Sequence, residues 1–348
     1  MKQVFIPLSF TEPPALPPDA QLMPLSGHTM GTTWSVKLLV SGGPQLQNQL
    51  QMLEQGIQAQ LDQVVAQMST WLASSDLCQF NQAAAGTWHR LPAEFFKVLD
   101  YAIFIAQQSA GAYDPSIGRI VNLWGFGPDK YDDLPGDPAL QEAKQSSGWQ
   151  KLQLDRVHQR AYQPGGLAID LSSIAKGFGV DQVARYLESQ AIPSYLVEVG
   201  GELRGFGTKP DHQPWWVELE QAPAIGQATP SAQDRMNILA LHGLSVATSG
   251  DYRRYIEKNG HRYSHTIDPR TAYPVTHPLA SVTVCHAECM VADALATAMM
   301  VMGAEQGLAY ANQLHVAALF LSYDVARDNT DNHFTEHMSN AMQAMLDA

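Results

Sequence analysis

The sequence predicts an α+β protein built on antiparallel strands. Strand-like segments come in runs separated by turn signals, and the regular alternation of strand and helix typical of a doubly wound parallel sheet is missing. Long amphipathic helical patterns flank these runs. Neither the GxGxxG pattern of a dinucleotide fold nor a GxxxxGK[ST] phosphate loop occurs in the chain.

The composition is that of a folded globular protein. The 348 residues include 21 Lys and Arg against 34 Asp and Glu, a formal charge of −13. Apolar residues make up 45% and charged residues 16%, which excludes the signature of disorder. The acidic balance argues against nucleic-acid binding, which requires a basic face. Because no run of about 18 apolar residues occurs, we expect no membrane-spanning helix.

The first third of the chain predicts an arm, a strand and two helices. Residues 1–25 are proline-rich and predict an extended N-terminal arm. Residues 32–40 alternate in polarity and are rich in β-formers, which predicts a strand. Apolar residues at steps of three and four predict a long amphipathic helix from Leu46 to Met68. A second helix is expected over about 92–110.

Strands broken by one helix are expected in the middle of the chain, and helices dominate towards its end. The polar stretch 128–148 predicts a loop or a short helical insertion. The expected strands are 152–154, 195–199, 215–219 and 279–284. The expected helices are about 173–190, 291–302 and 304–313. We therefore expect one domain at 26–325, followed by a C-terminal tail at 326–348 that could be helical.

The N-terminus does not resemble a signal peptide, because Pro7 and Glu12 interrupt its short apolar stretch. No cysteine lies near the N-terminus to carry a lipid, so the chain as it stands predicts a cytoplasmic protein. The three cysteines are Cys78, Cys285 and Cys289. An odd count without a CxxC pair predicts buried or half-buried free thiols and neither a zinc site nor a disulfide framework.

Asp293 and Thr297 are candidate metal ligands. They are four residues apart in an alanine-rich segment, so on a helix they share one face that another group can approach closely. Carboxylate and hydroxyl oxygens without Cys or His suit a hard cation such as Mg²⁺. The alternative is structural: Asp293 caps the helix near its start and Thr297 bonds back to it. From the spacing alone this structural interpretation is the commoner one.

The segment from Asp170 to Gly177 predicts a turn that leads into a helix. Ser172 and Ser173 are candidate N-caps, and a helix N-terminus offers free N–H groups to a phosphate. Lys176 lies in the first turn, where the helix dipole disfavours a cation, so we expect an anion nearby. The alternative is that its ammonium extends into solvent. Asp170 either caps the turn or accepts from an adenine amino group or a ribose hydroxyl.

His265 is the candidate general base among 12 histidines. Ser264, Asp268 and Arg270 lie close to it in the sequence, and an imidazole titrates near neutral pH. A Ser-His-Asp hydrolase is the rival interpretation. The chain contains no GxSxG motif to expose a nucleophilic serine, which argues against that rival.

Eight segments together resemble the ApbE family of FAD:protein FMN transferases. In order they are HTMGTTWSV, STWLASSDLCQFN, AYDPSIGRIVNLWGFGP, AIDLSSIAKGFGVDQVA, YLVEVGGELRGFGTKP, VATSGDYRRY, YSHTIDPRTAYPV and ADALATAMMVMG, and they extend from about residue 27 to 312. The resemblance implies an α+β fold with a T-fold-like antiparallel core and flanking helices. It also implies Mg²⁺-dependent transfer of FMN from FAD to a Thr or Ser hydroxyl of an acceptor protein, with release of AMP.

The resemblance also assigns roles to single residues. It implies FAD contacts for Met30, Trp71, Ala112, Tyr113, Asp114, Asp170, Lys176 and Ile267, with Trp71 stacked near the flavin. It implies Mg²⁺ ligation by the Ser173 carbonyl, Asp293 and Thr297. It implies that His265 takes the proton from the acceptor hydroxyl. These roles agree with the anion expected near Lys176 and with the hard cation expected at Asp293 and Thr297 from the chemistry of those residues alone.

Two other functions are compatible with the same residues. Water in place of the acceptor hydroxyl would make the protein an FAD pyrophosphatase that yields FMN and AMP. A non-catalytic FAD-binding protein is the second alternative. The implied partners are flavin-carrying subunits of redox complexes or reductases. The family is usually exported and anchored at the periplasmic face of the inner membrane, which this sequence does not predict.

The sequence departs from the family pattern at a few positions. Cys78 and Gln79 stand where Ser and Arg are usual. Ala272 stands where Gly is usual, which bears on the dihedral angles of its turn. None of these departures removes a residue with an implied catalytic role.

Overall fold

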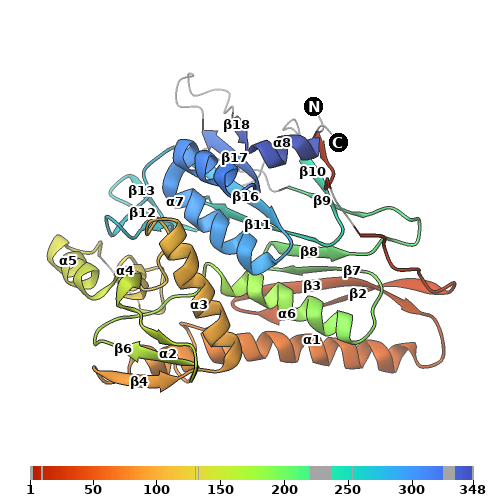
Figure 1. The fold of residues 1–348 in the computed structure, drawn as a ribbon, viewed down its shortest axis with the longest axis horizontal. Coiled ribbons are helices and arrows are strands. Elements are labelled where there is room, and N and C mark those ends of the chain that lie inside the picture. The colour runs from red at the N-terminus through yellow and green to blue at the C-terminus, as the bar shows by residue number, and fades with distance from the viewer. Residues whose placement is uncertain are drawn as a thin grey trace.

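An eight-stranded antiparallel sheet forms the centre of the computed structural model, which describes residues 3–8, 11–129, 131, 133–219, 237–252, 254–323 and 334–346 (Figure 1). In sheet order the strands are β18 (Phe334–Met338), β17 (Ala317–Tyr323), β16 (Leu279–His286), β11 (Leu244–Gly250), β8 (Glu202–Phe206), β7 (Tyr195–Val199), β3 (Thr32–Ser41) and β2 (Ala20–Thr29). Every neighbouring pair is antiparallel. The predicted α+β class is confirmed.

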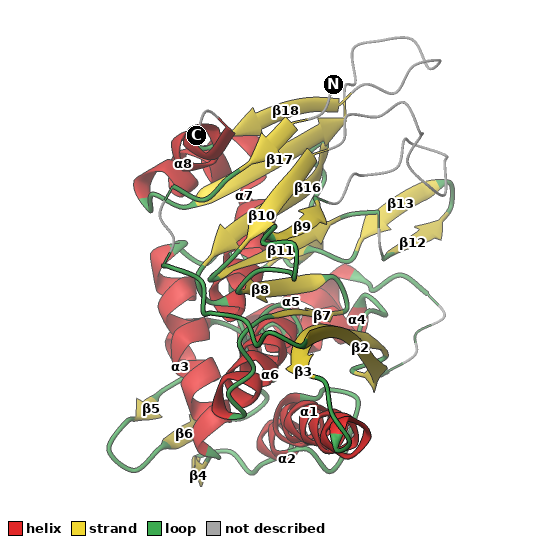
Figure 2. Ribbon diagram, turned by 90° about the vertical axis from the view of Figure 1, so that its right-hand side faces the viewer, coloured by secondary structure: helices red, strands yellow, loops and turns green. Residues whose placement is uncertain are grey.

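Helices cover one face of this sheet. α6 (Ala175–Ser189) and α7 (Cys289–Gln313) lie against the strands, α1 (Leu46–Met68) lies against α6 and β2, and α3 (Ala93–Gln108) packs outside them against α1 and α7. Figure 2 shows α6 and α7 alongside the strands, with α1 near the β2 end. The apolar stripe Leu53, Ile57 and Leu61 of α1 packs in one cluster with Val36 and Leu38 of β3. Burial of each such side chain contributes roughly 1.5–3 kcal/mol.

A smaller sheet and a short helix pack against the opposite face. The sheet contains β1 (Gln3–Phe5), β10 (Asn237–Leu241) and β9 (Trp215–Glu218), and the helix is α8 (Asn340–Leu346). Because successive strand residues face opposite ways, Val246 of β11 joins the cluster on this side, whereas Ala247 joins the cluster that contains α7. The central sheet is therefore buried on both faces at β11, β16 and β17.

Helix α7 contains a break at Gly303, where φ is +79°. Glycine adopts this left-handed conformation without the steric cost that other residues incur. The sequence predicted two helices, at 291–302 and 304–313, and the break lies between them. The first half of α7 carries Asp293 and Thr297.

Shorter elements surround one end of the molecule. They are α2 (Asp76–Asn81), α4 (Gly118–Leu123), α5 (Asp137–Ser146), the 3-10 turn Trp149–Lys151, β4 (Thr87–Arg90), β5 (Leu154–Asp155), β6 (Arg160–Gln163), β12 (Tyr255–Lys258), β13 (His261–Ser264), β14 (Ile267–Asp268) and β15 (Tyr273–Pro274). Of the two interpretations of 128–148, α5 supports the helical insertion. The predicted strand 152–154 is wrong in its position, because only Leu154 of it belongs to β5.

The two ends of the chain are more tightly integrated than the sequence predicted. β1 pairs in parallel with β10, and Phe5 is fully buried. β2 begins at Ala20, inside the expected arm, and pairs with β3 over its whole length. β18 adds an unpredicted edge strand beside β17, while α8 accounts for the helix expected in the tail. The proposed boundary at 325/326 lies outside the described residues.

The burial of the cysteines and the character of the helices can be compared with the sequence predictions. Cys78, Cys285 and Cys289 are all buried, and none forms a disulfide. No helix among the described residues has the length and apolar character needed to cross a bilayer.

Candidate active site

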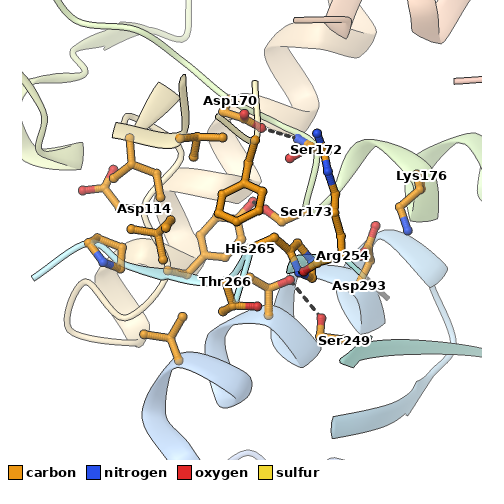
Figure 3. A pocket seen from close by; sticks show the side chains of 18 of the residues that line it. Asp114, Asp170, Ser172, Ser173, Lys176, Ser249, Arg254, His265, Thr266 and Asp293 are labelled. Atoms are coloured by element: carbon orange, nitrogen blue, oxygen red, sulfur yellow. Dashed lines mark hydrogen bonds between the residues drawn. The ribbon is translucent and has the colours of Figure 1, made fainter. Parts of the chain in front are cut away.

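Every site residue predicted from the sequence lines one of two adjoining cavities. The smaller cavity, about 310 Å³, is lined by Ala112, Tyr113, Asp114, Asp170, Ser173, Lys176, His265, Ile267, Asp293 and Thr297. The larger, about 790 Å³, is lined by Met30 and Trp71 and again by Lys176. Ser172 and Arg254 also line both cavities, so the two spaces meet at these side chains. Figure 3 shows the smaller cavity and its convergent polar groups.

Two turns place Met30 and Trp71 at the larger cavity. Met30 and Gly31 form the two-residue turn between β2 and β3, with φ of +48° and +72°. Positive φ at both central residues is typical of the tight turn that matches strand twist. After α1, the Ser69 hydroxyl accepts hydrogen bonds from the Trp71 and Leu72 amides, at 3.1 and 3.2 Å. This turn leaves the Trp71 side chain 60% exposed and available for stacking.

The segment from Ala112 to Asp114 forms a rigid wall of the smaller cavity. Asp114 accepts hydrogen bonds from the Ser116 amide (2.8 Å) and hydroxyl (2.6 Å) and from the Trp149 amide (3.0 Å). Burial raises the pKa of Asp114, and these hydrogen bonds oppose that shift. Burial also raises the pKa of Tyr113 far above its usual value, so its phenol stays neutral and can accept from the Ser173 hydroxyl at 3.1 Å.

The start of α6 differs from the sequence prediction. Neither Ser172 nor Ser173 caps the helix, because the N-cap position is Ile174 and no side chain caps it. Asp170 accepts from the Ser172 amide at 2.7 Å and so holds the turn that precedes the helix. The Ala175 amide donates to the backbone within this turn, which leaves fewer N–H groups for a phosphate than expected.

Lys176 forms an ion pair, as expected, but its anionic partner is a side chain of the protein. Its Nζ lies 2.5 Å from Oε1 of Glu202, which is only 1% exposed. Glu202 follows the Gly200–Gly201 turn between β7 and β8. The alternative in which the Lys176 ammonium simply extends into solvent is therefore wrong.

The structural interpretation of Asp293 and Thr297 is also wrong. Asp181 of α6 caps α7 by accepting from the Cys289 and Met290 amides, at 3.0 and 2.9 Å. Asp293 lies further along the helix, is 4% exposed, and accepts from the Gly177 amide at 3.0 Å. The Thr297 hydroxyl lies 3.1 Å from the Ser249 hydroxyl of β11 instead of bonding back to its own helix.

The oxygen donors around Asp293 fit a hard divalent cation. A regular helical turn would direct the Gly177 amide to the Ser173 carbonyl, but this amide donates to Asp293. Ser173 lines the smaller cavity, and among the described residues no hydrogen-bond donor contacts its carbonyl, so this oxygen keeps its acceptor capacity. The described residues contain no cluster of three or more His, Cys, Asp or Glu that could hold a metal. One carboxylate with neutral oxygens and ligand phosphates is the set that Mg²⁺ commonly uses.

A backbone contact orients His265. Its Nδ1 lies 2.9 Å from the carbonyl oxygen of Arg254. Because a carbonyl can only accept, Nδ1 carries the proton and Nε2 keeps the lone pair that a general base needs. The neighbours that the sequence singled out are engaged locally: Asp268 pairs with Arg270 at 2.9 Å, and Ser264 accepts from the Thr266 amide at 3.1 Å. These contacts do not build a Ser-His-Asp triad.

The loop after His265 contains one strained residue. Ala272 has a φ of +69° and is almost fully buried. Its carbonyl accepts from the indole of Trp124 at 2.9 Å. The turn therefore keeps a left-handed conformation although alanine replaces the usual glycine, which costs roughly 1 kcal/mol.

Sequence reasoning gave no role to several residues that line the site, among them Glu202, Ser249 and Arg254. Glu202 carried a weak signal, a carboxylate directly after a Gly-Gly turn. Ser249 lies in the segment VATSGDYRRY, which was singled out without a role for this hydroxyl. Arg254 lies in the same segment and was likewise given no role, because its position between the two cavities depends on contacts with Trp71 and Phe126.

Replacing Gly177 with alanine is expected to destabilise the junction between α6 and α7. The added Cβ would lie 2.4 Å from the Cys289 carbonyl oxygen and 2.9 Å from the Asp293 Cβ, so the helices must separate. We expect a loss of about 1–3 kcal/mol in the free energy of unfolding, measured by urea denaturation. Gly179→Ala is the matched control, because its Cβ would meet only side-chain ends at 3.2 and 3.3 Å. An equal effect of both substitutions would contradict the packing argument.

Comparison with known proteins identifies relatives that cover nearly the whole chain. The ApbE family model matches residues 30–320. The FAD:protein FMN transferase of Haemophilus influenzae is 38% identical over 334 residues, 94% of this chain and 93% of that protein. The protein of the same name from Vibrio cholerae is 39% identical over 332 residues, with the same coverage.

Solved structures give the same result. The apo crystal structure of the Pseudomonas stutzeri flavinyl transferase ApbE superposes with a TM-score of 0.82 at 35% identity, covering 94% of this chain and 98% of that chain. The flavin transferase ApbE from Vibrio cholerae superposes with a TM-score of 0.80 at 35% identity, covering 93% and 99%.

Proposed function

This chain belongs to the ApbE family, and on that basis we propose that it transfers FMN from FAD to a threonine or serine hydroxyl of an acceptor protein. The observation that carries the proposal is the pair of cavities that meet at Ser172, Lys176 and Arg254. A dinucleotide has two ring systems joined by a charged diphosphate. Each cavity could hold one ring system, and the cationic side chains at the junction could bind the diphosphate.

The two cavities suit different halves of FAD. Apolar side chains of Met30, Val64, Met68, Trp71 and Leu72 line the larger one, which favours the flat flavin ring. The smaller cavity offers the Asp170 carboxylate as an acceptor for an adenine amino group or a ribose hydroxyl. We infer that the flavin stacks near Trp71 and that the adenosine half enters the smaller cavity.

The reaction is a substitution at phosphorus. Nε2 of His265 takes the proton from the acceptor hydroxyl, and the oxygen forms a bond to the FMN phosphorus. The bond from that phosphorus to the bridging oxygen breaks, and AMP leaves with the electron pair. The Arg254 carbonyl holds the imidazole in the tautomer that this proton transfer requires. Lys176, fixed by Glu202, contributes positive charge where the cavities meet.

We further propose that Asp293, Thr297 and the Ser173 carbonyl hold Mg²⁺. This ion would neutralise charge on the diphosphate oxygens and polarise the phosphorus. Asp293 supplies the one carboxylate, and its bond to the Gly177 amide fixes the orientation of that carboxylate. Ser249 holds the Thr297 hydroxyl from the sheet side. For the acceptor, we propose a flavin-carrying subunit of a redox complex or a related reductase.

Removal of the metal tests the proposal directly. The purified chain is incubated with FAD, Mg²⁺ and a purified acceptor subunit that presents a reactive threonine. We expect the acceptor to gain one FMN by mass spectrometry, with AMP released in equal amount. Excess EDTA should abolish both products, and added Mg²⁺ should restore them.

The controls separate the alternatives. An acceptor in which the target threonine is replaced by alanine should gain no FMN. Free FMN and AMP without a labelled acceptor would favour a pyrophosphatase. FAD that stays bound and intact in the presence of Mg²⁺ and acceptor would favour a non-catalytic FAD-binding protein.

A further inference from the structure

Arg254 lies at the junction of the two cavities and is held there by aromatic rings. Its guanidinium carbon lies 5.8 Å from the ring centroid of Trp71 and 5.8 Å from that of Phe126. Trp71 lines the larger cavity and Phe126 the smaller, so this side chain spans the boundary between them. Figure 3 shows Arg254 among the side chains of the smaller cavity. The cation–π contacts hold the guanidinium without consuming its N–H donors.

Unlike most of the described arginines, Arg254 forms no ion pair with an acidic side chain of the described residues. Among the described residues, no carboxylate lies within ion-pair distance of it. Other arginines are paired with acidic side chains, namely Arg119, Arg156, Arg160, Arg204 and Arg270. Lys176, the other cation of the junction, is already engaged by Glu202 at 2.5 Å. Arg254 therefore offers a planar, permanently charged fork of donors to an incoming anion.

The main chain of the same residue supports the base. Because the Arg254 carbonyl accepts from Nδ1 of His265, the guanidinium and the imidazole are tied to one backbone position. A substitution at Arg254 keeps this carbonyl. Loss of the side chain can therefore be tested without removing the contact that sets the His265 tautomer.

We propose that Arg254 binds the diphosphate of the dinucleotide and so gives the site its preference for FAD over flavins that lack this linker. The inference rests on the proposed function, because it takes FAD as the ligand that fills both cavities. When a flavin enters the larger cavity beside Trp71, its linker must pass the residues that the cavities share. The guanidinium then exchanges aromatic contacts for charge-assisted hydrogen bonds to phosphate oxygens.

The test is a binding experiment with Arg254→Met, which removes the charge and keeps an unbranched side chain. FAD and riboflavin are titrated into the full chain by flavin fluorescence, with Mg²⁺ present and no acceptor protein. We expect Arg254→Met to weaken FAD binding about tenfold to a hundredfold, the range for charge-assisted hydrogen bonds, and to leave riboflavin binding nearly unchanged. Arg254→Lys should recover part of the loss. The affinity of the wild type for FAD should fall more steeply with salt than that of Arg254→Met.

Arg185→Met is the matched control. Arg185 also lies over an aromatic ring, with its guanidinium carbon 5.5 Å from the Phe178 centroid, and it lines neither cavity. If Arg185→Met lost as much FAD affinity as Arg254→Met, the loss would be due to the net charge of the protein, and the proposal would be overturned. If Arg254→Met lost FAD and riboflavin affinity equally, Arg254 would only support Trp71, and the proposal would be overturned. Unchanged FAD binding in Arg254→Met would also overturn the proposal.

The outcome is separable from that of the proposed function. The titrations require no FMN transfer, so a selective loss of FAD affinity supports the role of Arg254 even if no acceptor is ever labelled. Conversely, efficient labelling of an acceptor by Arg254→Met with unchanged FAD affinity refutes this role and leaves the transferase activity established.

Discussion

Replacing His265 with alanine is expected to slow FMN transfer about a hundredfold to ten-thousandfold, the range of general base catalysis. The substitution removes the group that we propose as the proton acceptor for the acceptor hydroxyl. FAD binding should stay close to that of the wild type, because the adenosine and flavin contacts come from other elements. Single-turnover formation of AMP in the presence of acceptor measures the chemical step.

The pH dependence distinguishes a base from a structural side chain. In the wild type the rate should fall at acid pH, since a protonated imidazole has no lone pair to accept the proton. Protonation removes the base, so activity should be retained at neutral and alkaline pH and lost at acid pH. The residual rate of His265→Ala should lack this acid limb. His261→Ala, at an exposed position on the same hairpin, is the control and should behave as the wild type. A normal transfer rate in His265→Ala would assign the base elsewhere.

Replacing Asp293 with alanine is expected to reduce the Mg²⁺-dependent rate by roughly a thousandfold or more, because loss of the carboxylate removes several kcal/mol of charge stabilisation. The same change leaves the Gly177 amide without its hydrogen-bond acceptor, which costs about 1–3 kcal/mol of folding stability. AMP release as a function of Mg²⁺ concentration, together with urea denaturation, measures the two effects separately.

Asp293→Asn separates metal binding from folding. Its amide oxygen can still accept from the Gly177 amide, so the free energy of unfolding should stay near that of the wild type. The lost negative charge should still raise the Mg²⁺ concentration needed for half-maximal activity. Thr297→Ser keeps the hydroxyl near Ser249 and should retain most activity. Full activity of Asp293→Ala at limiting Mg²⁺ would show that the ion is held by other residues.

Much of the fold could be predicted from local patterns. The apolar stripe from Leu46 to Met68 predicted α1, and alternation over 32–40 predicted β3. Both patterns reflect burial of one face, which each segment carries in its own sequence. β2 and β18 were missed. β2 was hidden in a proline-rich stretch, and β18 lies in a short polar segment whose pairing partner is β17.

The resemblance and the chemistry of single side chains pointed to candidate residues that all line the two cavities. Their contacts were less predictable. The structural alternative for Asp293 failed because Asp181, more than a hundred residues away, caps α7. The anion expected near Lys176 was Glu202. In each case the partner comes from another element, so spacing within one segment could not identify it.

The sequence by itself determined the α+β class, the principal helices, and the residue types needed for phosphoryl chemistry, since periodicity and side-chain chemistry are local properties. Only the tertiary structure decided that Asp293 faces Gly177 and not a cap position, that a backbone carbonyl sets the His265 tautomer, and that Arg254 spans two cavities. The contact of Asp293 with Gly177 and that of Arg254 with Trp71 join segments far apart in the chain. The contact of His265 with Arg254 is closed by the β12–β13 hairpin, so none of the three follows from the spacing within one element.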